Sequence, residues 1–89
     1  MPRVSFTQNL RRHVDCPEVN AAGATVAEVL LLVFAEHTRL KEYVLNEQGE
    51  LRKHMIVFLN GEPLKDRQRL TDAVKSDDEI VVMQALSGG

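Results

Sequence analysis

The chain has 89 residues, of which 44% are hydrophobic and 27% are charged, and its formal net charge is -2. A chain of this length forms one domain with a modest core, burying about 60 to 65% of the surface that its unfolded form exposes. Its balanced composition argues against disorder, and its Lys and Arg residues are too scattered for a nucleic-acid interface. The longest apolar run, residues 29–35, is too short to cross a bilayer. We therefore expect a cytoplasmic protein with neither a nucleic-acid nor a membrane partner.

The first predicted elements form a hairpin. Val4 and Phe6 alternate with polar neighbours, a period of two that is typical of a half-buried strand. The polar residues 8–17 separate this strand from a shorter one at residues 18–21. Cys16, the single cysteine, cannot form a disulfide within the chain, which agrees with a reducing compartment. We interpret it as a small loop residue and not as a reactive thiol.

A helix is predicted to begin after Thr25. Thr25 and Glu28 form a capping-box pattern, in which the hydroxyl accepts from an unpaired N–H of the first turn and the carboxylate accepts from an N–H before it. Further residues recur at steps of three and four, which places them on one helix face as far as His37 or Thr38. They are Val26, Val29, Leu30, Val33, Phe34 and His37. This face is expected to pack on the sheet.

The middle of the chain is expected to contain a short helical turn and a strand. Apolar residues at helical spacing predict the turn within residues 39–46, and residues 46–49 follow as a reverse turn. Residues 54–59 are rich in β-branched and aromatic side chains, and the Asn-Gly pair at 60–61 is a strong turn signal. The pattern predicts a central strand followed by a tight turn.

The last part of the chain is predicted to be irregular before a final strand. Residues 62–72 are expected to form a loop and edge structure, and residues 71–74 a single turn of helix. A polar turn at residues 76–79 leads into a strand at residues 80–85. Residues 86–89 then run off its end as a flexible tail.

The predicted order is hairpin, helix, strand, irregular link and strand. A compact way to bury one amphipathic helix is to lay it across one face of a mixed sheet, with the first and last strands parallel and adjacent in the middle. The predicted fold is therefore an α+β fold of the β-grasp (ubiquitin-like) type. It comprises one domain at residues 1–85 and the tail at residues 86–89.

Little in the sequence indicates chemistry within the domain. His13, His37 and His54 lack the spacing of a metal-binding pair, and no glycine-rich phosphate loop occurs. The acidic pair Asp77-Asp78 is interpreted as solvated surface. The lysines are also interpreted as surface residues: Lys41, Lys53, Lys65 and Lys75. We expect no metal, no bound cofactor and no enzymatic activity of this chain.

The terminal Gly88-Gly89 pair is the specific feature, because chance produces such an end in roughly one protein in 200. With the predicted fold, it makes the chain similar to the ubiquitin-like sulfur carriers (ThiS/MoaD-like). That family includes the small subunit of molybdopterin synthase, the thiamin-pathway carrier and a cysteine-biosynthesis carrier. The resemblance covers essentially the whole chain. It rests on the Thr25-capped helix, residues 49–61, the turn at 76–80 and the end Ala85-Leu86-Ser87-Gly88-Gly89.

The resemblance implies a mechanism that explains the glycines. In this family a separate, ubiquitin-activating-type enzyme uses ATP to adenylate the terminal carboxylate, and sulfur then replaces AMP to leave a thiocarboxylate. Gly89 would carry the sulfur, and Gly88 and Gly89, having no Cβ, would thread a narrow channel of the enzyme. A second partner would be the biosynthetic enzyme that accepts the sulfur. The length of residues 39–53 favours the molybdopterin or cysteine pathway, whereas Gln84 replaces a proline or apolar residue of many relatives. The carrier would be a monomer.

The two main strands carry apolar residues on both faces, although only one face can meet the helix. With the register taken from the resemblance, the inward residues are Val57, Leu59, Ile80 and Val82. The outward residues, together with Leu86, are a candidate partner surface: Ile56, Phe58, Val81 and Met83. A register shift of one residue would exchange the two faces.

Three functions stay open at this point. The first is sulfur carriage through Gly89. The second is protein modification, in which the same adenylate forms an isopeptide bond with lysines of target proteins. The third is an interaction module whose tail has no role, which predicts that function survives deletion of Gly88-Gly89. The sequence leaves the acceptor of the sulfur undefined.

Overall fold

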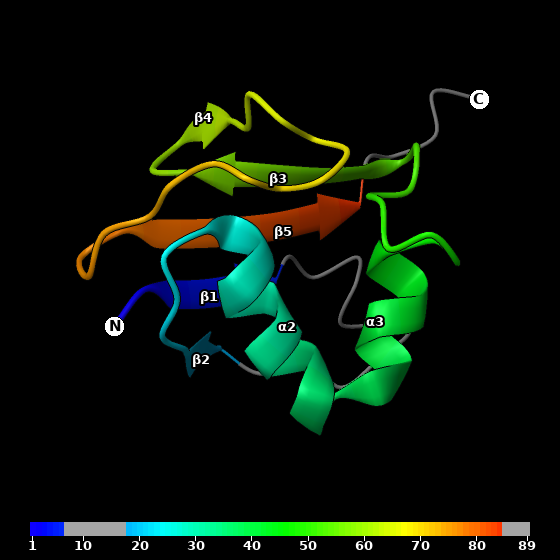
Figure 1. Cartoon of the computed structure of the whole chain (residues 1–89), viewed down its shortest axis with the longest axis horizontal. Coiled ribbons are helices and arrows are strands. Elements are labelled where there is room, and N and C mark those ends of the chain that lie inside the picture. Colours follow the sequence, from blue (N-terminus) through cyan, green and yellow to red (C-terminus); the bar gives the residue numbers. More distant parts are fainter. Residues whose placement is uncertain (7–17, 85–89) are drawn as a thin grey trace.

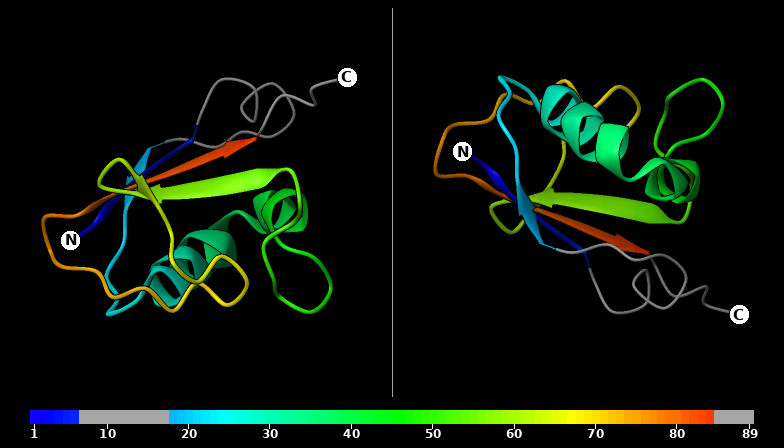
Figure 2. Two further views of the ribbon diagram at one scale, coloured as in Figure 1. Left: turned by 90° about the horizontal axis from the view of Figure 1, so that it is seen from above. Right: turned by 90° about the horizontal axis from the view of Figure 1, so that it is seen from below.

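The computed structural model describes residues 1–6 and 18–84 of the chain. The strands are β1 (Arg3–Phe6), β2 (Val19–Asn20), β3 (Met55–Leu59), β4 (Glu62–Pro63) and β5 (Glu79–Gln84), and the helices are α2 (Val26–Glu36) and α3 (Thr38–Val44). The strands form one mixed sheet in the order β2-β1-β5-β3-β4. Both helices lie on the same face of this sheet (Figures 1 and 2). The predicted α+β architecture is confirmed.

The centre of the sheet is formed by the first and last strands. β1 pairs in parallel with β5, so that Val4 lies opposite Ile80 and Phe6 opposite Val82. β3 pairs antiparallel with the other side of β5, with Val57 opposite Val82. The predicted hairpin is also present, because β2 pairs antiparallel with β1.

The start of α2 confirms the predicted cap, with one difference. The Glu28 N–H donates to Oγ1 of Thr25 at 3.2 Å, as expected. The Glu28 carboxylate accepts from the N–H of Ala24 at 3.3 Å, one residue earlier than in the standard capping box. The cap therefore also fixes the chain that enters the helix.

The single helical turn predicted at residues 71–74 is wrong. This segment is extended, and Ala73 forms an antiparallel bridge with Thr25. The carbonyl of Asp72 accepts from the N–H of Val26 at 3.0 Å. The first N–H groups of a helix have no partner within it. The segment stays extended because its backbone supplies one of these partners for α2.

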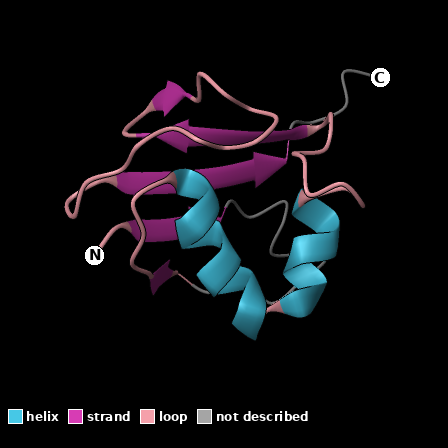
Figure 3. Ribbon diagram, viewed as in Figure 1, coloured by secondary structure: helices cyan, strands magenta, loops and turns pink. Residues whose placement is uncertain are grey.

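The second helix is longer than the short turn that we predicted. α3 has seven residues and lies beside α2 (Figure 3). Its side chains Leu40 and Val44 are completely buried in the same core as the apolar face of α2. Burial of one such side chain contributes about 1.5–3 kcal/mol, so tertiary packing offsets the weakness of a short isolated helix. The buried residues of α2 are those predicted, except that His37 is only half-buried: Val26, Val29, Leu30, Val33 and Phe34.

Two predicted turns are confirmed by their side chains and dihedral angles. Oδ1 of Asn46 accepts from the N–H groups of Gln48 and Glu50 at 2.9 and 3.0 Å. Asn60 and Gly61 have φ values of 53° and 84°, and such positive values at both central residues are typical of a type I′ hairpin turn. This second turn joins β3 to β4.

Gly23 is required by a close approach of the backbone to α2. A Cβ at this position would lie 2.8 Å from both Cγ2 and N of Val29. These distances are well below a normal van der Waals contact. The glycine therefore allows the chain from β2 to run close against the first turn of the helix.

Candidate docking surface beside the C-terminal strand

The C-terminal residues continue from the strand in the middle of the sheet. The last residue of β5, Gln84, pairs with Met55 at the start of β3. The predicted working residues Leu86, Gly88 and Gly89 lie outside the described residues, so their roles stay predictions. Five extended residues reach at most about 17 Å, which limits the distance from Gln84 at which a partner could bind the terminal carboxylate.

The predicted register of β3 and β5 is confirmed. Val57, Ile80 and Val82 face the helices and are 2%, 0% and 0% exposed. Leu59 also packs against the core but is only partly buried. Residues with the opposite orientation are half-buried on the other face: Ile56, Phe58, Val81 and Met83. We call these four residues the outer-face patch.

The outer-face patch is continuous across the two strands. Ile56 lies opposite Met83, and Phe58 lies opposite Val81. Directly opposed residues on one sheet face have Cβ atoms about 4.5–5.5 Å apart, so each pair is in contact. Neither helix covers this face of the sheet (Figure 2). A contiguous apolar surface that no described helix covers, next to the end of β5, is a candidate docking surface for a partner.

The opposite end of β5 is fixed by a polar network. Nδ2 of Asn60 donates to Oδ1 of Asp78, and Oδ1 of Asn60 accepts from the N–H of Glu79, both at 2.9 Å. Oδ2 of Asp78 accepts from the N–H of Lys75 at 2.7 Å. The side-chain hydrogen bond from Asn60, the backbone N–H of Lys75 and then the charge of Lys75 hold the pKa of Asp78 below its usual value. Asp78 lies at the surface, as predicted, and its hydrogen bonds also give it a structural role.

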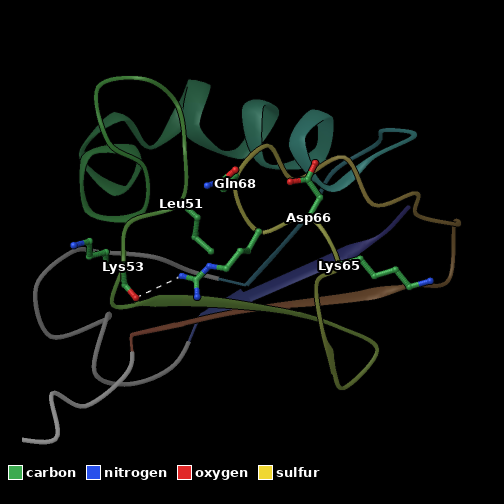
Figure 4. Close-up of a pocket in the computed structure, with 6 residues that line it drawn as sticks. Leu51, Lys53, Lys65, Asp66 and Gln68 are labelled. Atoms are coloured by element: carbon green, nitrogen blue, oxygen red, sulfur yellow. Dashed lines mark hydrogen bonds between the residues drawn. The ribbon is translucent and has the colours of Figure 1, made fainter.

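A shallow cavity of about 430 Å³ lies between the chain before β3 and the loop after β4 (Figure 4). Nη2 of Arg67 donates to the carbonyl of Met55 at 3.0 Å, with longer contacts to the carbonyls of Arg52 and Lys53. The side chains of Lys53 and Lys65 point away from each other in Figure 4. The cations do not converge on a ligand, and Arg67 instead fastens the loop to the start of β3.

A second acidic side chain in this loop also has a structural role. Oδ2 of Asp66 accepts from Oγ1 of Thr71 at 2.6 Å, and its Oδ1 accepts from the N–H of Arg69 at 3.0 Å. These bonds, the one from Thr71 most strongly, lower the pKa of Asp66. The carboxylate closes the loop on itself, which is a structural role.

The remaining candidates do not form a site in the described ranges. His37 caps the end of α2, and His54 lies in the turn before β3 and not within the strand. Residues 1–6 and 18–84 contain no group of three His, Cys, Asp or Glu residues that could hold a metal, whereas His13 and Cys16 lie outside them. The four lysines are exposed. None of the helices within residues 1–6 and 18–84 combines the length and the apolar character that crossing a membrane requires.

The fold defines the class of this protein, a ubiquitin-like β-grasp domain. One chain of the crystal structure of the Amycolatopsis orientalis BexX/CysO complex superposes with a TM-score of 0.83 at 30% identity, and all of both chains is covered. Small archaeal modifier protein 1 from Haloferax volcanii superposes with a TM-score of 0.79 at 27% identity, covering 99% of this chain and 98% of that one.

Within this class the chain belongs to the ThiS family, whose sequence pattern matches residues 4–89. A protein of Archaeoglobus fulgidus that is provisionally named a sulfur carrier is 28% identical over 72 residues, covering 81% of this chain and 82% of the relative. In sequence, small archaeal modifier protein 1 is 29% identical over 89 residues, covering all of this chain and 91% of the relative. The family thus contains small sulfur carriers and ubiquitin-like modifiers.

Proposed function

We propose that this chain is a sulfur carrier whose Gly89 carboxylate is activated by a separate adenylating enzyme and converted to a thiocarboxylate. The family match carries the proposal, because it extends to residue 89 and so includes the glycine pair. In this proposal the chain acts as a monomer in the cytoplasm. It has no catalytic residues and binds no cofactor; the activating enzyme uses ATP.

The chemistry needs nothing from this chain beyond a reachable carboxylate. The Gly89 carboxylate oxygen attacks the α-phosphorus of ATP, pyrophosphate leaves, and an acyl adenylate forms. Hydrosulfide attacks the carbonyl carbon, the C–O bond to AMP breaks, and the thiocarboxylate remains. When an enzyme persulfide supplies the sulfur, its terminal sulfur attacks the same carbon, and a second thiol then cleaves the S–S bond to give a disulfide and the thiocarboxylate.

The outer-face patch is the surface that we propose for docking to the adenylating enzyme. Phe58 and Val81 form one of its two pairs, and the other pair includes Met83 beside the last residue of β5. A partner that binds there would lie within the distance of about 17 Å that the five residues after Gln84 can span, so it could also bind the terminal carboxylate. A similar chain occurs in a complex named for two proteins, BexX and CysO, which supports a role in protein complexes.

The proposed acceptor is a biosynthetic enzyme of the molybdopterin or cysteine type. The segment between α2 and β3, which favoured this branch in the sequence, contains the additional helix α3. Leu40 and Val44 of this helix are fully buried in the core. The extra length is therefore part of the folded domain and not a loose insertion, which supports membership of the branch with the longer segment.

The test is to incubate the chain with ATP, a sulfur donor and the adenylating enzyme from its host, and then to measure its mass. Replacement of one oxygen by one sulfur has nominally the same mass as oxidation of a methionine. Fragmentation of the tryptic peptide 76–89 must therefore assign the change to Gly89 and not to Met83. We expect sulfur on Gly89, and no such product from a chain that lacks this residue. A sulfur-free Gly89 after complete turnover of ATP would contradict the proposal.

The second candidate is a protein modifier joined through Gly89 to lysines of target proteins. Its specific support is the similarity to small archaeal modifier protein 1, which covers the whole chain. The adenylate is shared by both functions, so activation alone does not separate them. Gly-Gly remnants on lysines of other proteins, absent when Gly89 is deleted, would identify the modifier.

A further inference from the structure

The two edges of the described sheet differ in how they are protected. The edge strand β4 consists of Glu62 and Pro63, and proline has no N–H to offer to another strand. The other edge strand, β2, consists of Val19 and Asn20 and carries neither a proline nor a charge. Natural proteins usually protect exposed edges because unpaired backbone groups attract other strands. Within the described residues β2 itself has neither a proline nor a charge, and the charge directly before it, that of Glu18, is paired with Arg3 at 3.5 Å.

The register of β2 shows which of its backbone groups face outward. The N–H of Ala21 donates to the carbonyl of Pro2 at 3.1 Å, and Val19 lies opposite Val4. In an antiparallel pair, residues alternate between those bonded to the neighbouring strand and those facing away from it. The backbone N–H and C=O of Asn20 therefore point away from β1, where an added strand could pair with them.

An apolar groove lies beside this edge. A cavity of about 310 Å³ separates β2 from α2, on the helix side of the sheet. Most of its lining is apolar, and it includes two strongly exposed side chains, Met1 (68%) and Leu32 (53%). Among the described residues that line it, Glu36 is the only carboxylate. An unprotected strand edge and an apolar groove are the two features that bind an extended peptide by strand addition.

We propose that β2 and α2 bind an extended segment of a partner protein as an added strand. Alternate apolar side chains of the segment lie in the groove against Leu32, and a basic residue lies near Glu36. A second copy of this chain is a poorer occupant. The apolar side chains of its own β2 region, Val19 and Ala21, already pack against its own core, so that strand has none to place in the groove.

This site is separate from the surface of the proposed function. The groove lies between β2 and α2, whereas the outer-face patch lies on β3 and β5. The patch is on the sheet face opposite the described helices (Figures 1 and 2). Both can therefore be occupied together. The added strand would keep one partner bound while the C-terminal residues are bound by another protein. Binding of the added strand does not depend on Gly89.

The test uses the full chain, labelled with ¹⁵N and ¹³C-methyl groups, and the capped peptide Thr-Val-Thr-Val-Thr-Val-Lys. We expect saturable shifts of the Asn20 and Ala22 amides and the Leu32 methyl groups. Two isomers of the peptide, N-methylated at the valines or at the threonines, each lack N–H donors along one edge. One isomer should bind at least about tenfold more weakly than the other, because only one edge pairs with β2. Equal binding by both isomers would overturn strand addition.

Neighbouring leucines of α2 provide a matched pair of variants. Leu32 lines the groove, whereas Leu31 does not, and they are 53% and 56% exposed. Leu32→Asp should weaken peptide binding at least about tenfold, and Leu31→Asp should leave it unchanged, with both amide spectra remaining those of a folded protein. Equal loss in both variants, shifts at Phe58 and Val81 only, or no shifts at the solubility limit would refute the proposal. Self-association through β2 that the peptide does not displace would assign the edge to a second copy instead.

Discussion

The two faces of the sheet are both apolar, but they serve different purposes. In β5 alone, Ile80 and Val82 are completely buried beneath the helices, while Val81 and Met83 are half-buried on the other face. The first pair holds the domain together through close packing. The second pair belongs to a surface that we assign to a partner. Hydrophobicity alone therefore does not identify core residues in this chain, and the register of the strands is needed.

The largest expected effect is on the free energy of unfolding, in a comparison of neighbouring residues on the two faces of the sheet. Ile80→Ala should lower the free energy of unfolding by about 2–5 kcal/mol, because it leaves a cavity in the core. Val81→Ala should lower it by about 1 kcal/mol or less, since no cavity forms on the half-exposed face. Urea denaturation of both variants measures the difference. Equal losses would show that the two faces are packed alike.

The second comparison adds one methyl group to each side of the sheet. Gly23→Ala should destabilise the domain by about 1–3 kcal/mol, because its Cβ would overlap Val29 at the start of α2. Ser5→Thr adds a methyl group on the outer face, opposite Val81, and should change stability by about 0.5 kcal/mol or less. Thermal unfolding of the two variants is the measurement. Unchanged stability of the Gly23→Ala variant would mean that this part of the helix layer is loosely packed.

The third comparison asks whether the outer-face patch binds the adenylating enzyme. Phe58→Thr removes an aromatic ring from the patch but keeps a good strand-forming residue. We expect the KM of the adenylating enzyme for this chain to rise about tenfold with little change in kcat. Leu31→Thr is the control, because it removes an apolar side chain that is more exposed than Phe58 from α2, away from the patch. ATP–pyrophosphate exchange gives both constants, and an unchanged KM for Phe58→Thr would assign docking to another surface.

The smallest effect concerns the network that fixes the register of β5. Since the pKa of Asp78 is lower in the folded chain, its ionised form stabilises the fold above about pH 4, and this contribution is lost as the pH falls further. Asp78→Asn should be less stable than the natural chain at neutral pH, and the two should converge at low pH. Urea midpoints at pH 7 and pH 3 test this. A difference that is as large at pH 3 as at pH 7 would mean that the charge of Asp78 is unimportant.

The overall topology could be predicted because local patterns and the global fold agree. The capping residues Thr25 and Glu28, the Asn60-Gly61 turn and the alternation in β1 each indicate one local structure, and the structure contains all of them. The register of β5 could not be predicted from the pattern, because apolar residues on both faces allow either face to be turned to the core. The resemblance to a family decided it correctly, where the pattern alone did not.

The misses have a common physical cause. The extended segment at 71–74 and the full length of α3 depend on contacts with α2 that no local pattern encodes. The bond between Asn60 and Asp78 joins residues 18 positions apart. The groove beside β2 was also missed, because it requires both the edge position of β2 and the orientation of Leu32. Long-range pairing thus decides the features that sequence patterns left undefined.

The central position of β5 has a consequence for biosynthesis. β5 separates β1 from β3, so the two halves of the sheet cannot join until residues 79–84 have been synthesised. Pairing of β1 with β5 closes a loop that spans most of the chain, and such distant pairings fold slowly. A nascent chain that stops before β5 therefore lacks the centre of its sheet. Only a polypeptide that extends through β5 can form the complete domain, so a chain truncated before this strand does not fold.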